Sequence, residues 1–186
     1  IYRFMNEDIG HFREFESIDL FEGGARELEE ALSSGQYKQI LIHLIDKKMW
    51  DIVKKYQDSI KIFIWIHGAE IQTWQRRAFE FDLMTSDQIE RQKKLSDARV
   101  KFWQNLLDHE AGENVHFIFV SQYLRAESEE GLERHFPKQQ TSVIHNYIDE
   151  EIFPYEPKSV EQRYNLLTIR PFSGKKYGND ITVNAL

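Results

Sequence analysis

Side chains that can bind a ligand or react with one stand directly behind three short apolar runs of this sequence. The runs are 59–66, 115–120 and 142–145, and the side chains behind them are His67, Ser121 and Asn146. An imidazole can hold or transfer a proton near neutral pH, and hydroxyl and amide groups both donate and accept hydrogen bonds. If the runs are parallel strands, their carboxyl ends meet at one edge of a sheet, where open parallel sheets bind their ligands. We therefore take these three residues as candidate site residues.

The first of these corners reads His-Gly-Ala-Glu and supplies two more candidates. Gly68 leaves the backbone beside His67 free of steric bulk, so that a ligand can approach it closely. Glu70 adds a carboxylate. Structural alternatives stand beside these interpretations: His67 can close a strand as a loop histidine, Ser121 can cap the helix that follows it, and Asn146 can hold a turn.

A cationic corner follows a later apolar run, 165–169. Arg170 comes directly after the run, and Lys175 and Lys176 stand behind a tight loop that contains glycine. Backbone amides and two or three cations would converge there on a pyrophosphate. The alternative is a solvated charge cluster.

The elements that must position these residues have the pattern of an α/β fold. Short apolar runs alternate with amphipathic segments, which predicts a parallel, Rossmann-like sheet with helices on both faces. The strands are expected at 39–45, 59–66, 115–120, 142–145 and 165–169. The run 39–45 is continuously apolar, so we expect it to be buried on both faces, with His43 as a core histidine.

Helices are expected between these strands and after the last of them. They are expected at 47–57, twice within 71–110, at 121–136 and from Asn179 onward. Ser86 or Asp87 is the expected cap of the second helix within 71–110. Residues 1–23 show no sustained period and carry no prediction.

Composition excludes several classes of function. The 24 basic and 31 acidic residues give a net charge of −7, which argues against nucleic-acid binding. Cysteine is absent, so thiolate metal sites and cysteine nucleophiles are excluded, and the histidines lack metal-ligand spacing. No signal peptide or long apolar span is visible, which makes a cytoplasmic location the default. No cofactor and no metal are expected.

Four stretches together resemble the retaining glycosyltransferases of family 4, especially those of capsule and O-antigen synthesis. They read IFIWIHGAE at 62–70, FIFVSQYL at 117–124, VIHNYID at 143–149 with Phe-Pro at 153–154, and LTIRPF at 167–172 followed by KYGND at 176–180. The resemblance covers about residues 37–186. It implies the GT-B fold, in which two Rossmann-like domains face each other across a cleft.

The resemblance also implies roles for the candidate residues. His67 matches the cleft histidine near the donor sugar, and Arg170 and Lys176, rather than Lys175, match the basic pair that neutralises the donor diphosphate in place of a metal ion. Gly68, Glu70, Ser121 and Asn146 would line the cleft on the acceptor side. The substrates would be a nucleotide-sugar donor and a polysaccharide or lipid-linked saccharide acceptor.

The chain begins with Ile1 and lacks two family features, a glycine-rich first strand ahead of residue 37 and the paired glutamates of the donor domain. We therefore expect a fragment that is inactive by itself. Residues 1–150 would form an incomplete acceptor-side domain, 151–164 a linker, and 165–186 the opening strand, loop and helix of the donor domain.

Two other functions remain open at this point. A sugar-nucleotide epimerase of GT-B fold would use a nucleotide-sugar without an acceptor, and a non-catalytic binding or assembly module would use neither. Paired cations on the predicted helices also suggest peripheral contact with the inner face of a membrane, because each cation near an anionic surface contributes about 1 kcal/mol. The pairs are at 47–48, 54–55, 76–77 and 93–94.

Overall fold

The computed structural model describes residues 1–5, 10–165 and 178–185. Its larger sheet has four strands, all parallel, in the order β4-β5-β6-β7. They are β4 (Gln39–His43), β5 (Lys61–Ile66), β6 (Val115–Phe119) and β7 (Thr141–Val143). The predicted α/β class and parallel sheet are confirmed, and each of these four strands ends within two residues of its predicted bounds. Such a sheet, flanked by helices, is compatible with a Rossmann-like fold.

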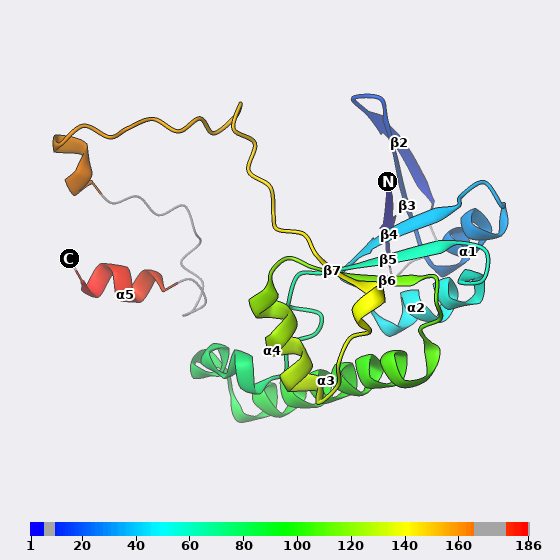
Figure 1. Ribbon diagram of the computed structural model, residues 1–186. Helices are drawn as coiled ribbons and strands as arrows, with labels where there is room; N and C mark the ends of the chain where they lie inside the picture. Colours follow the sequence, from blue (N-terminus) through cyan, green and yellow to red (C-terminus); the bar gives the residue numbers. More distant parts are fainter. Residues whose placement is uncertain (6–9, 166–177, 186) are drawn as a thin grey trace.

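Helices connect these strands and pack against one face of the sheet (Figure 1). They are α1 (Ala25–Ser33), α2 (Lys47–Val53) with the 3₁₀ turn η1 (Lys54–Tyr56), α3 (Ser86–Asn105) with the π-helical turn η3 (Leu106–Glu110), and α4 (Gln122–Leu132). From β4 to β7, each connection leads to the neighbouring strand, and the chain moves across the sheet in one direction. Because such crossovers share one hand, their helices lie on the same side of the sheet.

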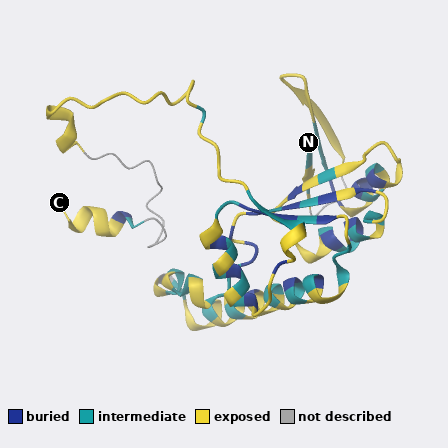
Figure 2. Ribbon diagram, in the orientation of Figure 1, coloured by how far each residue is buried: buried dark blue, intermediate teal, exposed yellow. Residues whose placement is uncertain are grey.

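The core lies between this face and the helices (Figure 2). On β5, Ile62, Ile64 and Ile66 are fully buried, whereas the alternate Phe63 and Trp65 are only partly buried. Side chains alternate between the two faces of a strand, so the two sets belong to opposite faces. The sequence predicts helices on both faces of the sheet. In the part of the chain that the structure describes, helices cover one face.

Two predictions about the first parallel strand are wrong for the same reason. β4 is the outer strand of the sheet, and it is not buried on both faces: Leu41 is 50% exposed, while its neighbour Ile42 is 3% exposed. His43 shares the open face with Leu41 and is an exposed residue rather than a core histidine. A continuous apolar run shows that a strand has apolar residues on both faces, but it does not show that both faces are covered.

The long connection between β5 and β6 differs from its prediction in detail. Its first helical part is a 3₁₀ segment, η2 (Gln75–Leu83), and its second is α3. The cap of α3 is Thr85, whose hydroxyl accepts from the amide of Gln88 while the Gln88 side chain accepts from the amide of Thr85. This capping box satisfies two amides at once, which explains why the helix begins there rather than after Ser86 or Asp87.

The predicted helix 121–136 is shorter than expected. α4 ends at Leu132 because Glu133 has a left-handed backbone with φ of 53°. The chain then turns so that Phe136 enters the core, with its ring edge-on to Phe117 and Phe119 at centroid distances of 5.0 and 4.8 Å. Such edge-to-face contacts add to the burial of the rings.

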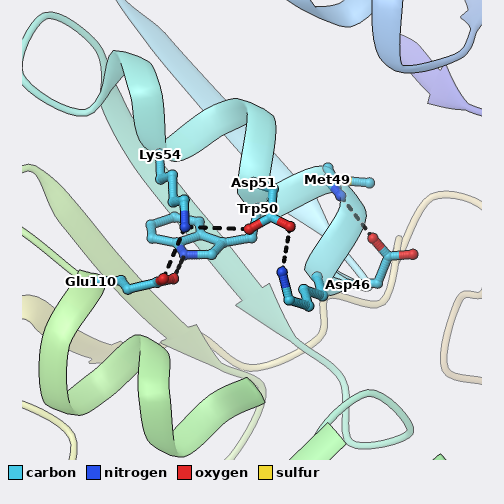
Figure 3. Close-up of polar contacts among 7 residues, drawn as sticks. Asp46, Met49, Trp50, Asp51, Lys54 and Glu110 are labelled. Carbon is cyan, nitrogen blue, oxygen red and sulfur yellow. Dashed lines mark hydrogen bonds and ion pairs between the residues drawn. The ribbon is translucent and has the colours of Figure 1, made fainter. Parts of the chain in front are cut away.

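A polar clamp joins α2 to the end of α3 (Figure 3). The indole of Trp50, which is fully buried, donates to Glu110 at 2.5 Å, and the ammonium of Lys54 donates to the other oxygen of Glu110 at 2.8 Å. The hydrogen bond from Lys54 is the largest cause that lowers the pKa of Glu110. The clamp fixes two helices that pack on the same face of the sheet.

Residues 1–23, for which the sequence made no prediction, contribute a second sheet of three strands. These are β1 (Tyr2–Phe4), β2 (His11–Phe15) and β3 (Ile18–Gly23), in the order β1-β3-β2. β2 and β3 form an antiparallel hairpin whose turn residues Glu16 and Ser17 both have positive φ. Such turns match the twist of paired strands.

The segment after β7 is largely exposed as far as residue 165 and contains the short 3₁₀ turn η5 (Glu161–Tyr164). The predicted helix from Asn179 is present as α5 (Asn179–Asn184). The predicted strand 165–169 lies outside the described residues except for Asn165, and the division into 1–150, 151–164 and 165–186 stays a prediction. No helix in the described ranges is both long and apolar enough to cross a membrane.

Candidate functional site

The carboxyl ends of the parallel strands bring three of the predicted residues to one edge of the sheet. Ile66 pairs with Phe119, and Phe119 pairs with Val143. His67, Ser121 and Asn146 follow these positions within three residues, so they lie at the same edge, as predicted. This is the edge at which open α/β sheets bind ligands.

A pair of histidines stands at this edge. Nδ1 of His43 lies 2.8 Å from Nε2 of His67, and the two rings stack with centroids 5.1 Å apart. The ring of His43 also stacks on Trp65 at 5.7 Å. A hydrogen bond between two imidazoles needs one nitrogen with a proton and one without, so the pair as built carries at least one acceptor nitrogen.

The environment of His43 disfavours its charged form. Burial lowers the pKa of His43, and the neighbouring His67 lowers it further, while Glu70 raises it. His43 therefore favours its neutral form near neutral pH. A neutral imidazole can accept a hydrogen bond or take up a proton.

The sequence reasoning missed His43 as a site residue. The signal was present, because His43 is the last residue of β4 and so lies at the same carboxyl edge of the sheet as the residues that we selected behind the other strands. We had assigned it to the core because the run around it is apolar. Its register partner is Trp65, which directly places it beside the end of β5.

The loop behind β5 is held from several sides. Glu70 is 8% exposed, and its Oε1 accepts from the amide of His67 at 2.5 Å. The carbonyl of Glu70 accepts from the indole of Trp103 at 2.7 Å. Glu70 thus positions the loop, and only its Oε2, which has no partner among the described residues, is unused.

Gly68 has a backbone conformation that the sequence reasoning did not predict. Its φ of 119° lies in a region that side chains rarely adopt, and the nearest atom to an added Cβ would be Cδ1 of Leu124 at 3.5 Å. The glycine is therefore required by the backbone turn rather than by crowding. The turn begins directly behind His67, where the chain leaves the edge of the sheet.

Ser121 caps a helix, whereas Asn146 lies in an exposed segment. The hydroxyl of Ser121 accepts from the amide of Leu124 at 3.0 Å and caps α4, which is the structural alternative stated above. Asn146 is exposed in the segment behind β7. Next to it, Nδ1 of His145 lies 3.1 Å from the carbonyl of Val120 and ties this segment to the end of β6.

Arg170, Lys175 and Lys176 lie outside the described residues, so their role stays a prediction. Within the described ranges, no group of three or more histidine and acidic side chains could hold a metal ion. Comparisons of the chain with models of known protein families, with curated proteins and with solved structures found no match.

Most of the paired cations have acidic partners. The ion pairs are Lys47–Asp51, Lys54–Glu110, Lys55–Glu29, Arg76–Glu130, Arg77–Glu80 and Lys93–Glu90. Each carboxylate offsets the charge of its partner, which reduces the attraction of these helices to anionic lipid. Contact with a membrane stays a prediction.

Proposed function

We propose that this chain serves a retaining glycosyltransferase of GT-B fold, as its acceptor-side domain and the opening of its donor domain. The observation that carries the proposal is the position of His67, at the carboxyl end of an inner strand of a parallel sheet, on a turn that needs Gly68. Ligands of such sheets bind at this edge. The sequence resemblance supplies the class of ligand, a nucleotide-sugar.

In the proposed reaction, the bond between the anomeric carbon and the diphosphate breaks, and a bond from that carbon to an acceptor hydroxyl oxygen forms. The hydroxyl proton is released. Negative charge develops on the departing diphosphate, and Arg170 and Lys176 would stabilise it, because fixed cations lower the energy of the transition state more than that of the ground state. His67, whose ring is hydrogen-bonded to His43, would hold a hydroxyl of the donor sugar.

The test is sugar transfer by the full-length enzyme of which this chain is proposed to be a part, from labelled UDP- and GDP-sugars to lipid-linked saccharide acceptors. His67→Ala should lower turnover at least about tenfold, which corresponds to ~1.4 kcal/mol of transition-state stabilisation. His109→Ala is the control, because His109 is exposed and lies in η3, which leads to the amino end of β6 at the opposite edge of the sheet. Equal rates for both variants would contradict the role of His67.

The same assay separates the two alternatives. An epimerase converts the nucleotide-sugar in the absence of any acceptor. A binding or assembly module shows no transfer and no heat of binding with UDP or GDP in calorimetry. Transfer that requires the acceptor is the result expected from our proposal.

A further inference from the structure

A hollow lies on the helical side of the molecule, between η2 and α3. Its volume is about 160 Å³, and its walls include Trp74 and Phe81 from the η2 side and Ser96 and Arg99 from α3. A water needs roughly 10–15 Å³ of such space, so the hollow has room for about ten waters or for one sugar ring with its substituents.

One buried hydroxyl and one partly buried guanidinium in this hollow can each bind a further partner. Ser96 is 5% exposed, and its hydroxyl has no hydrogen-bond partner among the described residues. Arg99 donates to the carbonyl of Ala69 at 2.6 Å, and no carboxylate in the described ranges forms an ion pair with it. Buried polar groups in folded proteins are normally hydrogen-bonded, and buried charges are normally paired.

The electrostatics of the hollow favour a single negative charge. Burial lowers the pKa of Arg99, and the neighbouring Arg77 lowers it further, while Glu70 offsets part of this effect. The other charges near the hollow are matched, because Arg77 pairs with Glu80 at 2.9 Å and Lys93 pairs with Glu90 at 3.5 Å. Arg99 thus forms no ion pair within the described residues and interacts only at longer range with Glu70, so the hollow suits a singly charged carboxylate better than a doubly charged phosphate.

Two aromatic rings form the apolar part of the wall, which is otherwise lined by Arg77, Glu80 and Gln92. The rings of Trp74 and Phe81 stack at a centroid distance of 6.3 Å, and the ammonium of Lys93 lies 4.9 Å from the centre of the Trp74 ring. Ring edges at this wall can pack against the C–H groups of a sugar. The hollow therefore combines a cation, a free hydroxyl and an apolar wall in the space of one ring.

We propose that this hollow binds an acidic sugar, with its carboxylate on Arg99, a hydroxyl on Ser96 and its ring against Trp74 and Phe81. The assignment of this sugar as a unit of the acceptor rests on the proposed function. The hollow is connected to the proposed reaction site through Arg99, which donates to the carbonyl of Ala69, two residues behind His67.

Binding can be measured without any donor, from the indole N–H signals of the four tryptophans in nuclear magnetic resonance spectra. Trp74→Phe identifies the signal of Trp74. Methyl glucuronide is the probe, methyl glucoside is its neutral counterpart, and sodium sulfate tests for general anion binding. We expect saturable movement of the Trp74 signal with the glucuronide below about 50 mM, and affinity at least about tenfold weaker for the glucoside.

Variants assign the contacts. Arg99→Gln should weaken glucuronide binding at least about tenfold, and Arg91→Gln should not, because Arg91 is exposed on the same helix outside the hollow. Arg99→Gln could also loosen the loop at Ala69. Ser96→Ala avoids this difficulty, because it removes a hydroxyl that has no partner and should weaken binding while leaving the fold stable.

The proposal is overturned by no movement of the Trp74 signal, by equal affinity for the glucoside or for sulfate, or by equal effects of the two arginine variants. These outcomes are separable from failure of the proposed function. Glucuronide binding without sugar transfer would remove the enzyme and keep this site, whereas transfer that is indifferent to Ser96→Ala and to the acceptor's charge would keep the enzyme and remove the site.

Discussion

Glu110→Ala tests whether the clamp between α2 and α3 holds the helical layer together. The substitution removes the acceptor of the Trp50 indole, which is 0% exposed, and the partner of Lys54, whose side chain is 31% exposed. An unsatisfied buried donor costs about 1–3 kcal/mol, and a partly exposed ion pair contributes about 0.2–1 kcal/mol. We expect a total loss of about 2–3 kcal/mol.

The assay is urea unfolding of the full chain at neutral pH. The midpoint should fall with an unchanged dependence on urea, and the melting temperature should fall by about 5–10 °C, since 1 kcal/mol shifts a chain of this size by about 2–4 °C. Lys54→Met is the matched control, because it removes the ion pair and leaves the indole bond; it should cost less than about 1 kcal/mol. Equal losses for the two variants would refute the reasoning, because the buried indole would then contribute nothing.

The clamp also predicts a pH dependence with a definite sign. The pKa of Glu110 is lowered from its ordinary value of 4.5, chiefly by the hydrogen bond from Lys54. As pH falls below 4.5, the unfolded chain takes up the proton first, so the contribution of Glu110 to stability is present above this pH and is lost as pH falls through the folded pKa. Glu110→Ala should remove this component of acid unfolding.

Further predictions concern the loop, the histidine pair, the two faces of the sheet and lipid. Gly68→Ala should cost about 1–3 kcal/mol in urea unfolding, because alanine rarely adopts a φ of 119°. The pKa of His43 is lowered from 6.5, so stability should fall as pH drops below 6.5, and His43→Gln should remove this component. Ile64→Ala should cost about 2–5 kcal/mol and Leu41→Ala less than about 1 kcal/mol, because only the former side chain lies in the covered face. The predicted membrane contact should appear as co-sedimentation with anionic vesicles that weakens as salt is added; co-sedimentation that is insensitive to anionic lipid and to salt would contradict it.

The order of the elements was predictable because it depends on local pattern. Apolar runs mark the strands, and parallel pairing follows from the helical segments between them. The edge at which His67 and Ser121 meet could be predicted for the same reason, since each residue directly follows a strand. The cap at Thr85 was missed by one residue, because the choice depended on the reciprocal bond with Gln88 rather than on residue type alone.

The features that the sequence reasoning missed depend on contacts between distant segments. His43 and His67 are 24 residues apart, and their contact depends on the register of two strands. The hollow beside Arg99 requires η2 and α3 to pack at a particular distance, which no short pattern specifies. Burial of a strand likewise depends on which elements cover the faces of the sheet. The apolar run of β4 does not contain this information, and for this reason the sequence reasoning wrongly predicted that both of its faces are covered.

The strand order gives the histidine pair a significance beyond its contacts. In doubly wound sheets, the ligand crevice lies where the chain reverses its direction of travel across the sheet. In the described part of this chain the order runs one way, from β4 to β7, and the helices cover one face. A reversal that covered the open face would begin at the outer edge of β4. The crevice would then open at the carboxyl end of β4, where His43 meets His67, so the pair stands where a two-sided sheet would bind its ligand.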